Sequence, residues 1–145
     1  MNSKKLIEIN KYNQKLTIAI KQEHHISQAR IDARLLSEKI GLNNIKLHEV
    51  VTSVSELAGN IFFHAINGGT IQLNVITNKG NTGMEVIATD KGPGIEDVKL
   101  AMQDGFTTNG GLGGGLPGVK RLMDNFKIIS EPGVGTTITT IKWKK

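Results

Sequence analysis

Two polar side chains, Glu56 and Asn60, lie four residues apart in a segment whose apolar residues have helical spacing. Residues at this spacing share one face of a helix, and His64 continues the same row. A carboxylate can take a proton from an attacking hydroxyl, and an amide oxygen is a neutral ligand for Mg²⁺. The pair therefore suits a general base beside a metal–nucleotide complex. Taken alone, a solvated helix face is the favoured interpretation, because this spacing of Glu and Asn often occurs by chance.

A second candidate is the Asp-x-Gly-x-Gly turn formed by Asp90, Gly92 and Gly94, which follows an apolar run typical of a strand. A carboxylate at the end of a strand can accept a hydrogen bond from an exocyclic amine such as that of adenine. The glycines let the backbone approach a flat base closely. A plain turn is an equally good interpretation, because Asp, Gly and Pro are the usual turn residues.

The third candidate is a glycine-rich segment that runs directly into a predicted helix at Leu116. Gly113, Gly114, Gly115 and Leu116 would present backbone N–H groups at the start of that helix, which suits phosphate groups. A flexible linker is the alternative, although linkers seldom run straight into an amphipathic helix. The spacing fits neither a dinucleotide-binding fingerprint, which needs a preceding strand, nor a Walker A loop, which needs Ser or Thr after the lysine.

The last candidate is Gly135-Thr136-Thr137, at the start of the final predicted strand. A threonine hydroxyl there would support the carboxylate of Asp90 if that carboxylate binds a base. Taken alone, an ordinary strand threonine is the favoured interpretation, because threonine is common in strands.

Hydrophobic periodicity predicts the helices and strands that must position these residues. Helical spacing covers residues 25–40, which Gly41 ends, and runs again from a cap at Asn43 or Asn44 to about Ala65. Strands in hairpins, with the helices gathered elsewhere in the chain, indicate an α+β fold with a mixed or antiparallel sheet, not a doubly wound parallel one. We expect strands at 15–21, 70–77, 84–90, 126–130 and 136–143, loops at 78–83 and 105–115, and short helices at 95–104 and 116–125.

Length and composition indicate a single domain over residues 1–145, with 38% hydrophobic and 21% charged residues. The absence of cysteine excludes disulfides and thiolate metal sites. No apolar run approaches the roughly 20 residues that span a bilayer, and residues 1–13 lack a signal-peptide core, so a cytoplasmic location is expected.

The net charge of the chain is +5, but the lysines and arginines are dispersed along the sequence. This dispersal favours solubilising termini over nucleic-acid binding, and it leaves an acidic protein partner open.

The order of these candidates along the chain resembles the ATP site of the GHKL superfamily, which has the Bergerat fold, over about residues 15–143. The chain looks closest to the bacterial serine kinases related to anti-sigma factors. Among these it is similar to the RsbT-type stressosome switch kinases, which are serine/threonine kinases. Residues 55–61, 113–124 and 141–143 carry this resemblance.

The resemblance implies a two-layer α/β sandwich with helices on one face of the sheet. It also implies a kinase that uses Mg-ATP to phosphorylate Ser or Thr hydroxyls of STAS-domain stressosome proteins and is then released to activate a regulator such as a PPM-type phosphatase. Carried over by motif, Asp90 would hold the adenine amine, Asn60 would ligate Mg²⁺ and Glu56 would orient or deprotonate the attacking hydroxyl. The base would also contact Gly92, Gly94 and Thr137, and the phosphates would contact Gly113, Gly114, Gly115 and Leu116.

Two alternatives stay open. The chain could be a nucleotide-regulated binding module with vestigial phosphotransfer, although Glu56 argues against this because nucleotide binding alone needs no general base. It could also be an anti-sigma-factor-type kinase that binds a sigma factor directly. Binding to nucleic acid or membranes is not expected. Residues 105–115 are predicted to form a lid ordered mainly by ATP, and Mg²⁺ is predicted to bind only together with nucleotide.

Overall fold

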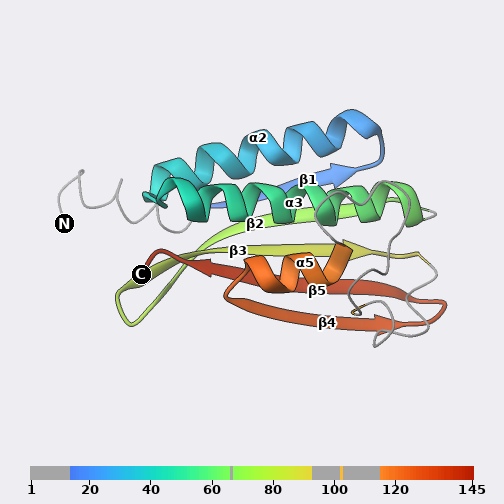
Figure 1. Ribbon diagram of the computed structural model, residues 1–145. Coiled ribbons are helices and arrows are strands. Elements are labelled where there is room, and N and C mark those ends of the chain that lie inside the picture. Colours follow the sequence, from blue (N-terminus) through green and yellow to red (C-terminus); the bar gives the residue numbers. More distant parts are fainter. Residues whose placement is uncertain (1–13, 66, 93–101, 103–114) are drawn as a thin grey trace.

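The computed structural model describes residues 14–65, 67–92, 102 and 115–145. They form a two-layer α+β sandwich in which helices cover one face of a five-stranded sheet (Figure 1), which confirms the predicted fold class. The elements are, in chain order, β1 (Lys15–Ile20), α2 (Glu23–Ile40), α3 (Asn44–His64), β2 (Gly69–Asn78), β3 (Asn81–Asp90), α5 (Gly115–Leu122), β4 (Asn125–Glu131) and β5 (Gly135–Trp143).

The strands lie in the order β1-β2-β3-β5-β4, and every neighbouring pair is antiparallel. Asp90, the last residue of β3, pairs with Gly69 at the start of β2. On its other side it pairs with Thr136 near the start of β5. The predicted functional aspartate therefore lies at the end of the sheet where β2 and β5 begin.

Burial alternates along the central strands, because one face of the sheet packs under the helices. The buried residues of β3 include Met84, Val86 and Ala88, and those of β5 include Ile138 and Thr140. The opposite face is covered by no helix of the described residues (Figure 1). Position along a strand therefore decides whether a side chain reaches the helices or the uncovered face.

Capping residues define the junction between the two long helices. Gly41 has a left-handed φ of 85°, and its N–H points to the carbonyl groups of Ser37 and Glu38, which confirms the predicted end of α2. The side-chain oxygen of Asn43 accepts the Lys46 N–H at 2.8 Å, which confirms the predicted cap of α3.

α2 begins at Glu23, two residues before its predicted start. The cause is a hydrogen-bond network ahead of the helix: Nδ1 of His25 accepts the N–H groups of Lys21 and Gln22, both at 3.0 Å. These bonds satisfy backbone donors that have no partner within the helix. Hydrophobic spacing does not reveal such a network.

The connection between β2 and β3 is a two-residue turn, so the predicted loop over residues 78–83 is wrong. Lys79 and Gly80 have positive φ values of 52° and 79°. Two such residues favour a type I′ turn, whose twist matches that of the flanking strands, so pairing continues to the turn. Gly83 then lies within β3 against Trp143, where a Cβ atom would lie 2.7 Å from the indole ring.

α5 ends at Leu122, three residues before its predicted end, because the chain enters the sheet at once. The Asp124 N–H donates to the carbonyl group of Ile141 at 2.9 Å, and Asn125 begins β4. The predicted helix at 95–104 and loop at 105–115 lie outside the described residues except for positions 102 and 115. Within the part of the chain that the structure describes, no helix is long and apolar enough to cross a membrane.

Candidate functional site

Glu56 lies on the buried side of α3 and is only 7% exposed. The interpretation of the Glu56 and Asn60 pair as a solvated helix face is therefore wrong for Glu56. Asn60, one turn further on, is half-buried, whereas His64 is exposed at the helix end. A carboxylate is costly to desolvate, so burial of Glu56 is unusual for a glutamate on a helix.

Asp90 organises the turn that follows β3. Its Oδ1 atom accepts the N–H of Gly92 at 2.9 Å, so the residues do form the turn that their types predict. Gly92 is buried against the end of α3, since a Cβ atom there would lie 3.1 Å from both Ala65 Cα and Asp90 Oδ1. The aspartate turn and the C-terminal end of α3 are therefore in direct contact.

Two more glycines bring backbone against Asp90. Gly135 has a φ of 148°, and a Cβ atom there would overlap the carbonyl oxygen of Asp90. A Cβ atom at Gly69 would lie 3.1 Å from Asp90 Cα and would overlap the carbonyl oxygen of Thr89. The strand ends close around the aspartate because these positions have no side chains.

The threonine beside Asp90 is Thr136 rather than Thr137. Thr136 is 7% exposed and pairs with Asp90 on the helix-covered face of the sheet. Thr137 pairs with Ile129, which is 54% exposed, so Thr137 belongs to the uncovered face. Thr136 Oγ1 also lies 2.8 Å from Ser130 Oγ. Of the two threonines in the Gly135-Thr136-Thr137 motif, the resemblance implied Thr137 as the contact to the base, whereas strand alternation combined with the β3–β5 register places Thr136 beside Asp90.

α5 begins at Gly115, the first described residue of the segment that is predicted to bind phosphate. Gly115 has a left-handed φ of 68°, and Leu116 is 7% exposed, so the first turn of the helix is anchored in the core. Gly113 and Gly114 of the same segment, and Gly94 of the aspartate turn, lie outside the described residues.

The fold assembles these groups around α3, which contacts both β3 and α5. Glu56 and Asn60 therefore lie on the helix that contacts both β3, which ends at Asp90, and α5, which begins at Gly115. In the described ranges, no group of three or more His, Cys, Asp or Glu side chains could hold a metal ion. The amide oxygen of Asn60 can contribute one ligand to a metal whose other ligands are phosphate oxygens and water. A carboxylate beside glycine backbone suits a flat base with an amine, so these residues fit a metal–nucleotide complex.

Comparison with known proteins decides the family. A model of the histidine kinase-like ATPase domain matches residues 18–142. The chain belongs to this family. This histidine kinase-like ATPase is 43% identical over 131 residues to the serine/threonine-protein kinase RsbT of Bacillus subtilis, over 90% of this chain and 98% of RsbT. It is 30% identical over 123 residues to an anti-sigma F factor of Halalkalibacterium halodurans, over 81% of this chain and 83% of that factor. The resemblance to RsbT-type kinases is confirmed.

Solved structures share the fold of this histidine kinase-like ATPase at low identity. The RsbU and RsbW domains of Rv1364c from Mycobacterium tuberculosis match with a TM-score of 0.61 and 20% identity, over 89% of this chain and 32% of that longer chain. The SiaB–SiaC complex from Pseudomonas aeruginosa matches with a TM-score of 0.57 and 11% identity, over 99% of this chain and 98% of the other. At these identities the likeness supports the fold alone.

Proposed function

We propose that this histidine kinase-like ATPase is a serine/threonine protein kinase of the RsbT type. It binds Mg-ATP and transfers the γ-phosphoryl group to a serine or threonine hydroxyl of a STAS-domain stressosome protein. The observation that carries the proposal is the position of Glu56, a buried carboxylate on the helix that contacts both the Asp90 strand and α5. The 43% identity to RsbT supports the same activity.

The end of β3 supplies the group that binds the base. The Gly92 N–H orients the carboxylate of Asp90, which accepts a hydrogen bond from the exocyclic amine of adenine. Gly92, and Gly94 as the resemblance implies, would leave space for the base beside the backbone. Thr136, rather than the Thr137 that the resemblance implies, would support Asp90, because it lies beside the aspartate on the same face.

Asn60 would hold Mg²⁺ through its amide oxygen, with the remaining ligands from the triphosphate and water. The phosphates would lie against backbone N–H groups at the start of α5, where the helix dipole favours anions. The resemblance assigns these groups to Gly113, Gly114, Gly115 and Leu116. When bound, the metal neutralises charge on the transferred phosphoryl group.

Glu56 acts as the general base. As the partner's hydroxyl oxygen bonds to the γ-phosphorus, the bond from that phosphorus to the β–γ bridging oxygen breaks and ADP leaves. The proton of the hydroxyl passes to the carboxylate of Glu56 and then to solvent. A positioned base of this kind accelerates transfer by about 10²–10⁴-fold.

The partners follow from the proposed class. After phosphorylating its STAS-domain partners in the cytoplasm, the kinase is released and activates a downstream regulator such as a PPM-type phosphatase. The 30% identity to an anti-sigma F factor favours a second candidate, an anti-sigma-factor-type kinase that also holds a sigma factor.

A phosphoryl-transfer assay tests the proposal. The purified chain is incubated with γ-labelled ATP, Mg²⁺ and STAS-domain proteins encoded near its gene. We expect label on a serine or threonine of a STAS protein, and none when Mg²⁺ is chelated. Retention of a sigma factor in place of STAS proteins would favour the second candidate. Nucleotide binding without transfer to any partner would reduce the chain to a regulated binding module and refute the kinase assignment.

A further inference from the structure

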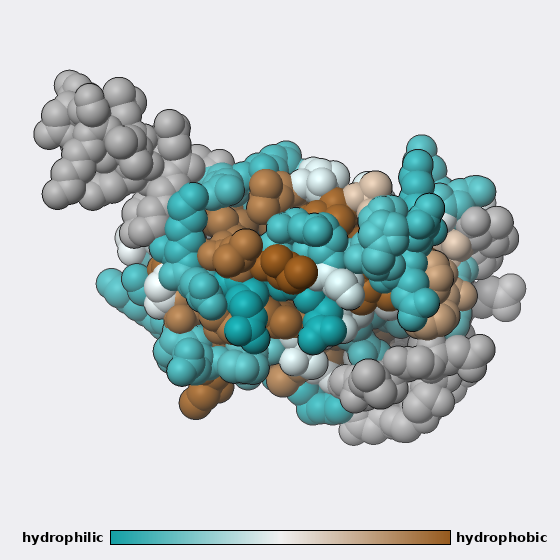
Figure 2. All heavy atoms as spheres, turned by 90° about the horizontal axis from the view of Figure 1, so that it is seen from above, coloured by the Kyte–Doolittle hydropathy of each residue, from teal (hydrophilic) through white to brown (hydrophobic). Residues whose placement is uncertain are grey.

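Lys142 of β5 lies beneath the helices rather than on the surface. Hydrophilic side chains surround the apolar ones on the helix-bearing face (Figure 2), and lysines ordinarily lie at such a surface. Among the lysines that the structure describes, Lys142 is the only buried one, at 4% exposure. A buried ion pair can often be replaced by apolar residues without loss of stability. Stability alone therefore does not account for this lysine, and none of the contacts proposed for the nucleotide involves it.

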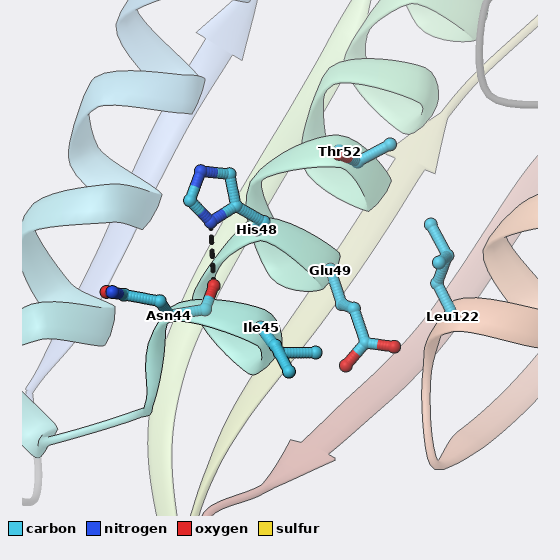
Figure 3. Close-up of a pocket in the computed structure, with 6 residues that line it drawn as sticks. All are labelled: Asn44, Ile45, His48, Glu49, Thr52 and Leu122. Atoms are coloured by element: carbon cyan, nitrogen blue, oxygen red, sulfur yellow. Dashed lines mark hydrogen bonds between the residues drawn. The ribbon is translucent and has the colours of Figure 1, made fainter.

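The ammonium group of Lys142 joins three elements. It donates hydrogen bonds to Glu49 Oε1 of α3 at 3.1 Å and to the carbonyl oxygen of Leu122, the last residue of α5. It also lies 3.5 Å from Oδ1 of Asp124, which follows that helix. Figure 3 shows the Glu49 side chain extending from α3 into the space between Ile45 and Leu122. One lysine thus fixes the C-terminal end of α5 against both α3 and β5.

α5 depends on such contacts because it is short. It has only eight residues, or about two turns, and isolated helices of this length are not stable in water. Leu116 and Val119 anchor its first part in the core, at 7% and 1% exposure. At its other end, the positive charge of Lys142 lies at the last carbonyl group, where it also complements the helix dipole. Because a helix is rigid, holding its C-terminal end also directs its first turn.

Lys142 also relates α5 to the face of α3 that carries the proposed catalytic groups. Glu49 lies seven residues before Glu56, which is close to two helical turns, and Asn60 follows one turn later. The three side chains therefore share one face of α3. Asn60 would hold the metal and the start of α5 would hold the phosphates. The two must keep a fixed separation if both are to contact one nucleotide.

We propose that Lys142 is a positioning residue for the triphosphate. By tying the C-terminal end of α5 to Glu49 of α3, it holds the first turn of α5 where it meets the phosphates of the nucleotide that Asn60 binds through the metal. This role rests on the proposed function, because it needs a nucleotide in that site. It extends that function by making recognition of the phosphates, but not of the base, depend on a side chain at the opposite end of α5.

A comparison of Mg-ATP with adenosine, using the full chain, tests this role. Adenosine has the same base and no phosphate, so removal of a residue that positions the phosphate site should leave its affinity unchanged. We expect Lys142→Met to weaken Mg-ATP binding at least about tenfold and adenosine binding by less than about twofold in calorimetric titrations. Asp90→Asn, which alters the contact to the base, should weaken the binding of both ligands.

Lys46→Met is the matched control. The ammonium group of Lys46, on α3, donates to the carbonyl groups of Trp143 at 2.8 Å and Lys144 at 2.9 Å. These bonds join α3 to the end of β5 and the residue after it, without involving α5, so the ratio of the two affinities should stay unchanged. Glu49→Gln is a milder change to the contact between Lys142 and α3, because the Glu49 side chain is 27% exposed. We expect it to weaken Mg-ATP binding about threefold and to leave adenosine binding unchanged.

Three results would overturn the role of Lys142. They are equal losses of Mg-ATP and adenosine binding in Lys142→Met, unchanged Mg-ATP affinity in that variant, and the same selective loss of Mg-ATP binding in Lys46→Met. Thermal unfolding shows whether Lys142→Met is folded. If it is not, Glu49→Gln decides, and the absence of a selective loss there would also overturn the role. Failure of the proposed function is distinguishable, because the unmodified chain would then bind no Mg-ATP.

Discussion

Asp90 and Thr136 face each other across the ladder between β3 and β5, on the side of the sheet that the helices cover. The Gly92 N–H orients the carboxylate through a 2.9 Å hydrogen bond, and Thr136 Oγ1 lies 2.8 Å from Ser130 Oγ. A carboxylate and a hydroxyl thus share one strand end. Each can be altered without removing the other, so their contributions to nucleotide binding are separable.

Asp90→Asn should lower ATP affinity by about 10–100-fold, because a hydrogen bond to a charged group is worth about 1.5–3 kcal/mol. The amide oxygen of the variant can still accept the Gly92 N–H, so the turn should remain folded. Titration calorimetry with ATP measures the effect, and thermal unfolding serves as the control. Unchanged ATP affinity would remove Asp90 from the site and undermine the proposed function.

Thr136→Val should weaken ATP binding by about five- to tenfold, whereas Thr137→Val should change it by less than about twofold. The reason is that only Thr136 shares the face of Asp90. Ser130→Ala controls for loss of the hydroxyl–hydroxyl contact without loss of the threonine. A larger effect at Thr137 than at Thr136, measured by the same calorimetry, would contradict the assignment.

Glu56→Gln should leave ATP affinity within about threefold and slow phosphoryl transfer by about 10²–10⁴-fold, because glutamine cannot accept the proton of the attacking hydroxyl. The readout is the rate of partner phosphorylation at saturating Mg-ATP. Glu38→Gln is the matched control, since Glu38 is an exposed glutamate of α2. Undiminished phosphorylation by the Glu56 variant would exclude it as the base.

Mg²⁺ alone should not bind measurably to the nucleotide-free chain, because one asparagine oxygen is too few ligands for this ion. Calorimetric titration with MgCl₂ should show no binding heat beyond dilution. With ATP present, Asn60→Ala should raise the Mg²⁺ concentration needed for half-maximal binding by about tenfold. Tight Mg²⁺ binding to the nucleotide-free chain would argue for a different metal site.

Gly135→Ala should destabilise the fold by at least about 3 kcal/mol, and Gly133→Ala by only about 1 kcal/mol. Both glycines have positive φ, but only the Cβ atom at position 135 would overlap the carbonyl oxygen of Asp90. At Gly133 nothing lies within 4 Å of that position. Urea unfolding of the two variants measures the difference, and equal losses would show that the strand ends do not close tightly around Asp90.

Local chemistry made much of the molecule predictable from its sequence. Gly41 and Asn43 mark the junction between α2 and α3, because a left-handed glycine and a capping side chain act within a few residues of their own position. The positions of Asp90 and Gly92 in a turn follow from the same kind of short-range preference. The α+β class follows from alternating and helical hydrophobic patterns, which depend only on neighbouring residues.

Burial of Glu56 and the choice between Thr136 and Thr137 were settled only by tertiary structure. Alternation alone allows either of two faces of β5 to point inward, and the face with Ile141 and Trp143 is the more apolar one in sequence. The fold instead buries the face that contains Thr136 and Lys142. A lysine is buried only where its charge is paired, and its partners, Glu49 and Asp124, come from distant parts of the chain. The ion pairs of Lys142 occur together with the β3–β5 register that places Thr136 beside Asp90. Both join residues that are far apart in the chain, so no local pattern in the sequence predicts them.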